Sequence, residues 1–288
     1  MRRPPASLPI PLTFALVLLL ALAAAPGCTD DSAASSLDEV ALLDDADAVL
    51  DSLLARWQTA TADVSGFTLA TDVFIARYVR RPDGTFGPVG VEPRTAEAAQ
   101  GGPPPVQFLH PDRQRVAALL RGRSDLVLDP TAAPPRYRLV ARPEALAVPG
   151  GVPTLDSTAT PEAADIVVEA GTYHLREVRT RSPLPGSEVD SAVVDLRIAY
   201  GDYRVVDGLA VPHAVSVNAS GLLETFDEGQ LMFMRAQYQQ RLSRAANLTG
   251  EARAAEEAEL ADLKALLLDG TSTETMQVDS VAVQRDAE

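Results

Sequence analysis

The residues able to carry chemistry are few in this chain and stand far apart in the sequence. The 288 residues include three histidines, His110, His174 and His213, and one cysteine, Cys28. Zinc and iron sites draw most of their ligands from these two residue types, so no metal site is expected. No nucleophile elbow, phosphate-binding glycine loop, dinucleotide glycine pattern or paired-histidine zinc motif occurs. We therefore expect a protein that is not an enzyme and binds no cofactor. An enzyme of unknown type remains an alternative.

His213 is the histidine whose surroundings best suit a ligand site. Asp207-Gly208 is typical of a type I′ hairpin turn, and an alternating apolar strand follows it. His213 falls on the apolar side of that strand, so it could enter a cavity as a base or a ligand-binding group. No acidic residue stands at a matching spacing, and a histidine of the core or its rim is the alternative. His110, beside Pro111, is typical of a cap or turn, and His174 of a half-exposed strand.

Acidic residues outnumber basic ones. The 40 Asp and Glu residues against 25 Lys and Arg residues give a formal net charge of −15. A protein with this balance and no basic block does not attract nucleic acid or anionic lipid head groups by its overall charge. We therefore expect no nucleic-acid partner.

The first residues have the pattern of an export signal. Arg2 and Arg3 precede a run from Leu12 to Ala25 that is apolar except for one threonine. The run is too short for a membrane-spanning helix, which needs about 20 residues, and its length suits a signal peptide. The only cysteine of the chain follows where such a signal ends.

Gly27-Cys28 and the residues before it resemble the lipobox of bacterial lipoproteins. The resemblance implies a signal peptide over residues 1–27, acylation of Cys28 and a lipidated tether over residues 28–36. Thr29 is not the aspartate that retains lipoproteins in the inner membrane of familiar Gram-negative systems. The resemblance thus implies an outer-membrane lipoprotein that faces the periplasm. The alternative is ordinary cleavage near Ala23, with Cys28 as a spare thiol.

Residues 37–288 are expected to form a single domain. Ser36-Leu37-Asp38-Glu39 fits a capping box, so an amphipathic helix is expected from there to about Thr61. A period of two then predicts one long strand from Phe67 to Arg80, which ends at a turn over Arg81–Gly84.

The second part of the chain predicts short strands, then two helices and a last strand. A short helix is expected from Pro111, and residues 228–268 form a helical insertion. Gly201, and a slip of the alternation at Asp279-Ser280, predict β-bulges. Strands are expected at Leu126–Leu128, Tyr137–Ala141, Ile166–Glu169, Tyr173–Arg179, Val193–Val206, Leu209–Val217 and Met276–Val283. This order predicts an α+β fold with a curved antiparallel sheet and helices gathered on one side.

Three features together resemble the carrier and receptor proteins of the Lol lipoprotein-sorting system. They are the export signal, the amphipathic helix with Trp57 near its end before a strand that begins Gly66-Phe67, and the strand-turn-strand segment Gly201–Pro212. The resemblance covers roughly residues 38–226 and 274–284. It implies an unclosed antiparallel β-barrel of about eleven strands, with helices as a lid, around an apolar cavity for acyl chains.

The candidate cavity lining consists of one tryptophan and the apolar faces of two predicted strands. These residues are Trp57, Phe67, Leu69, Val73, Ile75, Leu209, Val211, His213, Val215 and Val217. An ordinary filled core is the alternative.

Three hypotheses about function follow. The first is a membrane-anchored periplasmic lipoprotein that binds acyl chains or acylated proteins in an apolar cavity and serves lipid or lipoprotein trafficking. The second is a lipoprotein of the same fold that senses the envelope or binds a protein partner through the helices of residues 228–268. The third is a periplasmic enzyme of unknown type.

Overall fold

The described part of the chain forms one antiparallel sheet with helices at its two ends. The computed structural model describes residues 42–95, 106–146, 161–183 and 192–286. The strands are β1 (Val64–Thr71), β2 (Phe74–Arg80), β3 (Phe86–Pro93), β4 (Ser124–Asp129), β5 (Arg136–Ala141), β6 (Ala163–Glu169), β7 (Leu175–Pro183), β8 (Val193–Val206), β9 (Leu209–Ser220) and β10 (Ser272–Arg285). The helices are α1 (Ala46–Ala60), α3 (Arg113–Leu120), α4 (Pro143–Leu146), α5 (Glu228–Ala245) and α6 (Gly250–Asp269), with short 3₁₀ turns η2 (Val106–Phe108) and η3 (Leu222–Thr225).

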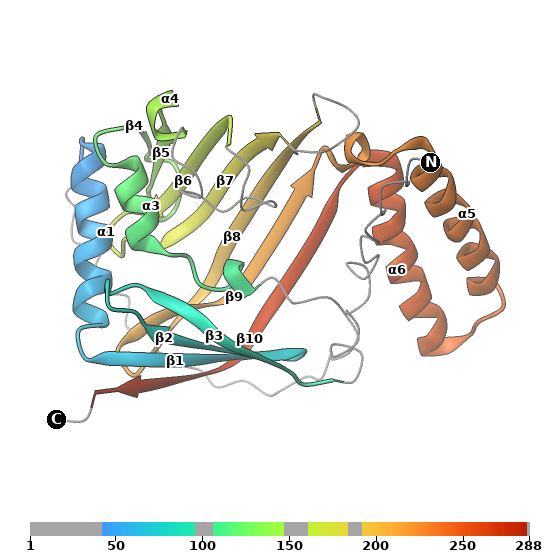
Figure 1. Cartoon of the computed structure of the whole chain (residues 1–288), viewed down its shortest axis with the longest axis horizontal. Coiled ribbons are helices and arrows are strands. Elements are labelled where there is room, and N and C mark those ends of the chain that lie inside the picture. Colours follow the sequence, from blue (N-terminus) through green and yellow to red (C-terminus); the bar gives the residue numbers. More distant parts are fainter. Residues whose placement is uncertain (1–41, 96–105, 147–160, 184–191, 287–288) are drawn as a thin grey trace, which may run out of the picture.

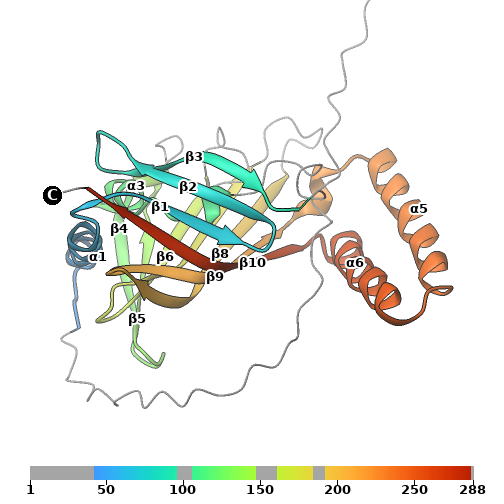
Figure 2. The same cartoon turned by 90° about the horizontal axis from the view of Figure 1, so that it is seen from below.

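The sheet is not closed into a barrel. Its strands lie in the order β3-β2-β1-β10-β9-β8-β7-β6-β5-β4, so β3 and β4 are its two edges (Figures 1 and 2). The prediction of an unclosed antiparallel sheet with helices is thus confirmed. The described ranges contain ten strands where about eleven were expected.

The helices form two groups instead of the single lid expected from the sequence. Helices α1, α3 and α4 lie near β4, β5 and β6, whereas α5 and α6 extend from the other end of the sheet (Figure 1). Helix α5 packs against α6, and α6 contacts β10 and η3. The two helices expected over 228–268 are present as α5 and α6, and they form a projecting hairpin (Figure 1). Gly270, in the left-handed conformation at φ 64°, ends α6.

Helix α1 begins later than its predicted capping box. Residues 42–45 are not helical, and Asp45 is the N-cap, where its side chain accepts a hydrogen bond from the Ala48 amide at 2.9 Å. The predicted box is wrong as the start of this helix, and residues 36–41 lie outside the described ranges. The helix ends at Ala60 with Thr61 as its C-cap, as predicted.

The predicted single strand from Phe67 to Arg80 is wrong, because the chain reverses within it. β1 ends at Thr71, and β2 returns antiparallel beside it. The buried Thr71 hydroxyl accepts hydrogen bonds from the amides of Val73 at 3.3 Å and Phe74 at 3.1 Å. This threonine turn needs no glycine or proline, so the usual turn signal is missing from the sequence.

The other predicted irregularities have opposite outcomes. At the β8–β9 turn, Asp207 and Gly208 have φ values of 48° and 78°, which confirms the hairpin. The register of β8 and β9 continues unbroken past Gly201, so no bulge exists there. Opposite β1, β10 does carry the predicted bulge, because Asp279 is the extra residue between two consecutive pairs.

We predict that Thr71→Val destabilises the protein by about 2 kcal/mol, because the buried amides of the turn lose their acceptor. Urea unfolding monitored by circular dichroism measures the change. Thr68→Val is the matched control on the same strand, and less than about 0.5 kcal/mol is expected because Thr68 lies on the opposite strand face. Equal losses in both variants would contradict this role of the turn.

Candidate functional site

Most of the predicted lining residues meet in the protein interior. Eight of the ten are less than a tenth exposed: Trp57, Phe67, Leu69, Leu209, Val211, His213, Val215 and Val217. The seven apolar ones belong to one continuous hydrophobic cluster, which joins α1 to β1 and β9. The sequence therefore identified correctly which faces of α1, β1 and β9 point inward.

Val73 and Ile75 do not share the inner face of Phe67 and Leu69, which corrects their assignment to the lining. Because the chain turns at Thr71, Phe67 pairs with Tyr78 and Leu69 pairs with Ala76. Ile75 is half-buried between the buried neighbours Phe74 and Ala76, so it lies on the other face of β2. Val73, in the turn, is half-buried and packs at the margin of the cluster. The inner residues of β2 are Phe74, Ala76 and Tyr78.

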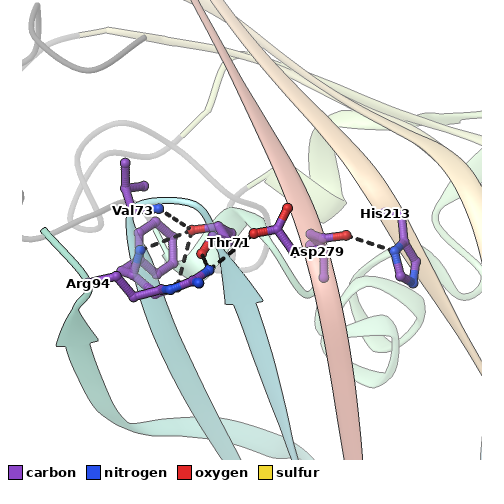
Figure 3. A network of polar contacts seen from close by, with 7 residues as sticks. Thr71, Val73, Arg94, His213 and Asp279 are labelled. Atoms are coloured by element: carbon purple, nitrogen blue, oxygen red, sulfur yellow. Dashed lines mark hydrogen bonds and ion pairs between the residues drawn. The ribbon is translucent and has the colours of Figure 1, made fainter. Parts of the chain in front are cut away.

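His213 bonds across the place where β10 changes partners. β10 pairs with β9 as far as Gln277 and with β1 from Val278 onward. The Nδ1 atom of His213 lies 2.8 Å from the Val278 carbonyl oxygen (Figure 3). Because a carbonyl only accepts, Nδ1 carries a proton and donates it to this bond. Nε2 is buried and has no partner among the described residues.

A second polar contact group joins the opposite side of β10 to the turn at Thr71. Arg94, just after β3, donates to the Asp279 carboxylate at 3.1 Å and to the Thr71 carbonyl oxygen (Figure 3). Both side chains of the Arg94–Asp279 ion pair are nearly half exposed, so the pair contributes little to stability. We assign these contacts, and the Nδ1 bond of His213, to holding the strands together.

A buried arginine lies against the aromatic part of the interior. Arg113, the first residue of α3, is 5% exposed, and its guanidinium carbon is 4.1 Å from the centre of the Trp57 ring. The His110 ring packs between the rings of Trp57 at 5.0 Å and Phe67 at 4.8 Å. Burial, and then the charge of Arg113, hold the pKa of His110 well below its usual range, so this ring is neutral.

The charge of Arg113 acts on a group of polar side chains that includes the half-buried His174. The His174 ring stacks on Tyr203 at 4.2 Å, and the guanidinium carbon of Arg176 lies 5.2 Å from the centre of the same ring. The Tyr203 hydroxyl donates to the Leu175 carbonyl oxygen at 2.5 Å. We call the following six residues the Arg113 cluster: Arg56, Arg113, His174, Arg176, Tyr200 and Tyr203.

The electrostatics of the cluster are positive. The pKa of His174 falls to about 4, first because of burial and then because Arg176, Arg113 and Arg56 repel its protonated form. Glu169 is the carboxylate that opposes this shift. Burial raises the pKa of Tyr203, against the pull of Arg113. The neutral histidine thus stands among three guanidinium groups.

The buried polar atoms that lack a hydrogen-bond partner among the described residues include two donors of the Arg113 cluster. Nη1 of Arg113 and the hydroxyl of Tyr200 are both buried and have no hydrogen-bond partner among the described residues. Tyr200 is 3% exposed, and burial raises its pKa, so its phenol remains protonated. Buried donors normally have partners, and such exceptions call for a physical explanation.

The sequence did not single out Arg113, Tyr200 or Tyr203. One signal for Arg113 exists, because an arginine at the first position of a helix opposes the helix dipole. Tyr200 continues the alternation of buried Leu196 and Ile198 along β8, which places it inward. Neither signal reveals that both side chains are buried with an unpaired donor.

The chain matches no known family. No family model, no curated protein and no solved structure gives a match. The Lol resemblance therefore stays a prediction based on residues alone. Within the described ranges, no helix is both long and apolar enough to cross a membrane, and no three metal-binding side chains gather as a site.

A pair of tyrosine variants tests the unpaired hydroxyl. We predict that Tyr200→Phe leaves stability unchanged or raises it by up to about 1 kcal/mol, since it removes an unpaired buried group. Tyr203→Phe should lower stability by about 1 kcal/mol, because its hydroxyl is bonded to Leu175. Chemical unfolding of both variants measures the difference, and a larger loss in Tyr200→Phe would contradict the assignment.

His174 gives a pH prediction. The unfolded chain binds a proton at this ring near pH 6.5, whereas the folded protein does so only near pH 4, so stability falls as the pH drops between these values. From pH 7 to 4, wild type should lose about 1 kcal/mol more than His174→Gln, with allowance for the half-exposed ring. His110 is present in both proteins and cancels. Parallel stability curves would contradict the shifted pKa.

Proposed function

We propose that this protein is a lipid-anchored envelope protein that binds acyl chains, free or attached to a protein, between its open sheet and helices α1 and α3. One observation carries the proposal. The interior of the unclosed sheet is apolar, yet it holds Arg113 and Tyr200 with unpaired donors. An amphiphile has an apolar chain for the first feature and a polar end for the second.

The elements that cover the open side of the sheet support entry of an acyl chain. Along its open side, helix α1 contacts α3 and β4, and η2 contacts β3. No strand pairing joins these helices to the sheet, so their separation would leave every strand pair intact. A closed barrel would have to break strand hydrogen bonds to open.

The amino-terminal pattern supports the location. The signal-like run before Cys28 favours export and acylation of that cysteine. Several acyl chains on one residue would anchor the protein firmly, since each buried methylene contributes about 0.8 kcal/mol. The net charge of −15 gives no attraction to an anionic membrane, so on this proposal the anchor is the lipid.

A protein-interaction or sensing role is the second candidate, and one observation favours it. Helices α5 and α6 extend beyond the sheet (Figure 2) and expose large apolar side chains. They are Met232, Phe233, Leu242 and Leu268, which are 69%, 54%, 45% and 65% exposed. Three of the four lie on α5, and an exposed apolar patch is typical of a contact surface.

The test uses the full chain, purified gently from membranes. We expect mass spectrometry to find an acylated Cys28, and Cys28→Ser to leave the membrane fraction. We expect the wild type to bind a fluorescent fatty-acid probe, with natural fatty acids displacing it. Phe233→Ser on α5 is the control, and it should bind the probe equally well.

The outcomes separate the two candidates. Absence of both bound lipid and probe binding would overturn the acyl-chain proposal. An unmodified Cys28 would overturn the anchor alone. Loss of probe binding in Phe233→Ser would place the binding site on α5 instead of inside the sheet.

A further inference from the structure

Arg113 is a buried cation with no counter-ion among the residues that the structure describes. It is 5% exposed and forms no ion pair within 4.0 Å with any carboxylate that the structure describes. The face of the Trp57 ring attracts the charge but accepts no hydrogen bond in the plane of the guanidinium. A buried charge is normally paired, because its loss of hydration is otherwise uncompensated. The arrangement therefore lacks a negative partner.

The carboxylate of the cluster is already engaged. Glu169 is 4% exposed, and it accepts hydrogen bonds from Arg176 at 2.6 Å and from the Thr172 hydroxyl at 2.7 Å. Its charge is thereby balanced by Arg176. Glu169 therefore does not balance the charge of Arg113 as well.

The missing partner must be an acceptor. Of the unpaired atoms in the cluster, Nη1 of Arg113 only donates and the hydroxyl of Tyr200 can donate, so an acceptor would suit both. Both side chains are buried, at 5% and 3% exposed, and the charge of Arg113 acts to lower the pKa of Tyr200. Carboxylate and phosphate oxygens accept several hydrogen bonds and suit a planar guanidinium.

The positively charged residues of the Arg113 cluster range from exposed to buried. Arg56 is exposed and lies with its guanidinium carbon 5.6 Å from the centre of the Tyr173 ring. His174 and Arg176 are half-buried, and Arg113 is buried. An anion would therefore meet positive charge from solvent to interior. The net charge of the chain predicts no such attraction, and the cluster is a local exception to it.

We propose that the Arg113 cluster binds the anionic head, a carboxylate or phosphate, of the amphiphile whose acyl chain packs beside Trp57 and Phe67. This inference rests on the proposed function and specifies its ligand. Arg113 and Tyr200 donate to the head oxygens, and His174, Arg56 and Arg176 line its way in. The aromatic rings around His110 receive the first part of the chain.

The experiment compares two fluorescent probes on the full-length protein: a fatty acid and its uncharged methyl ester. Wild type should bind the acid about tenfold more tightly than the ester, the effect of one charge-assisted hydrogen-bond pair. Arg113→Gln should remove this difference by weakening acid binding about tenfold while leaving the ester unchanged. Arg115→Gln is the matched control, because Arg115 is exposed on the same helix and should change neither probe.

Tyr200→Phe guards against misfolding of the arginine variant. It removes one donor and is not expected to destabilise the fold, so a several-fold loss of acid binding with ester binding kept supports the head-group site. Circular dichroism verifies the fold of each variant. Unchanged acid binding in both Tyr200→Phe and a folded Arg113→Gln would overturn the site.

The other outcomes distinguish the two proposals. Equal binding of acid and ester by wild type would overturn the anionic head and leave the acyl-chain function standing. If neither probe binds but inorganic phosphate does, and Arg113→Gln abolishes that binding, the site is one for free anions and the acyl-chain function is wrong. No binding of any of the three would overturn both. Failure of phosphate to compete with the acid at equal concentration supports an amphiphile as the ligand.

Discussion

The last strand of the chain joins the two parts of the sheet, and the interior depends on that pairing. β10 pairs with β9 through Ser272–Gln277 and with β1 through Val278–Arg285. Without it, the sheet of β1, β2 and β3 would have no hydrogen-bonded connection to the sheet of β4 to β9. Strand β1 carries Phe67 and β8 carries Tyr200, so the aromatic and polar parts of the interior come from opposite sides of β10. Pairing of such distant segments is slow to form, because the loop must close before the contacts stabilise it.

The change of partner along β10 explains two otherwise odd residues. A strand that leaves one neighbour for another leaves backbone groups without ladder partners. The His213 ring donates to the Val278 carbonyl oxygen and so supplies its hydrogen-bond partner. The bulge at Asp279 lies where β10 pairs with β1. His213 is the histidine that the sequence favoured as a ligand group. The change of partner along β10 explains the hydrogen bond of its Nδ1 atom.

The sequence predicted elements whose signals are local. The β8–β9 hairpin is specified by Asp207-Gly208, because both positions need positive φ, and α5 and α6 by their helical period. The β1–β2 turn was missed because the Thr71 hydroxyl stabilises it and no glycine or proline marks it. The alternation of apolar and polar residues also continues through the turn. Strand β3 was missed because Gly87 and Pro88 within it are typical of loops. The wrong prediction for Ile75 followed from the missed β1–β2 turn, since a shift of one residue in the alternation moves a side chain to the other face of the sheet.

The candidate site was only partly predictable, and the reason is physical. Apolar faces such as that of Leu209 and Val211 can be read from alternation, because the period of the strand fixes them. The burial of Arg113 depends on α1 bringing Trp57 against α3, which no local pattern specifies. An apolar interior by itself is what any folded domain has. An ordinary core does not need unpaired donors such as those of Arg113 and Tyr200, because groups that lose water without gaining a hydrogen-bond partner destabilise the fold. The arrangement is consistent with a protein that completes its interior with a ligand, since donors that lack a partner within the protein can gain one when an acceptor binds.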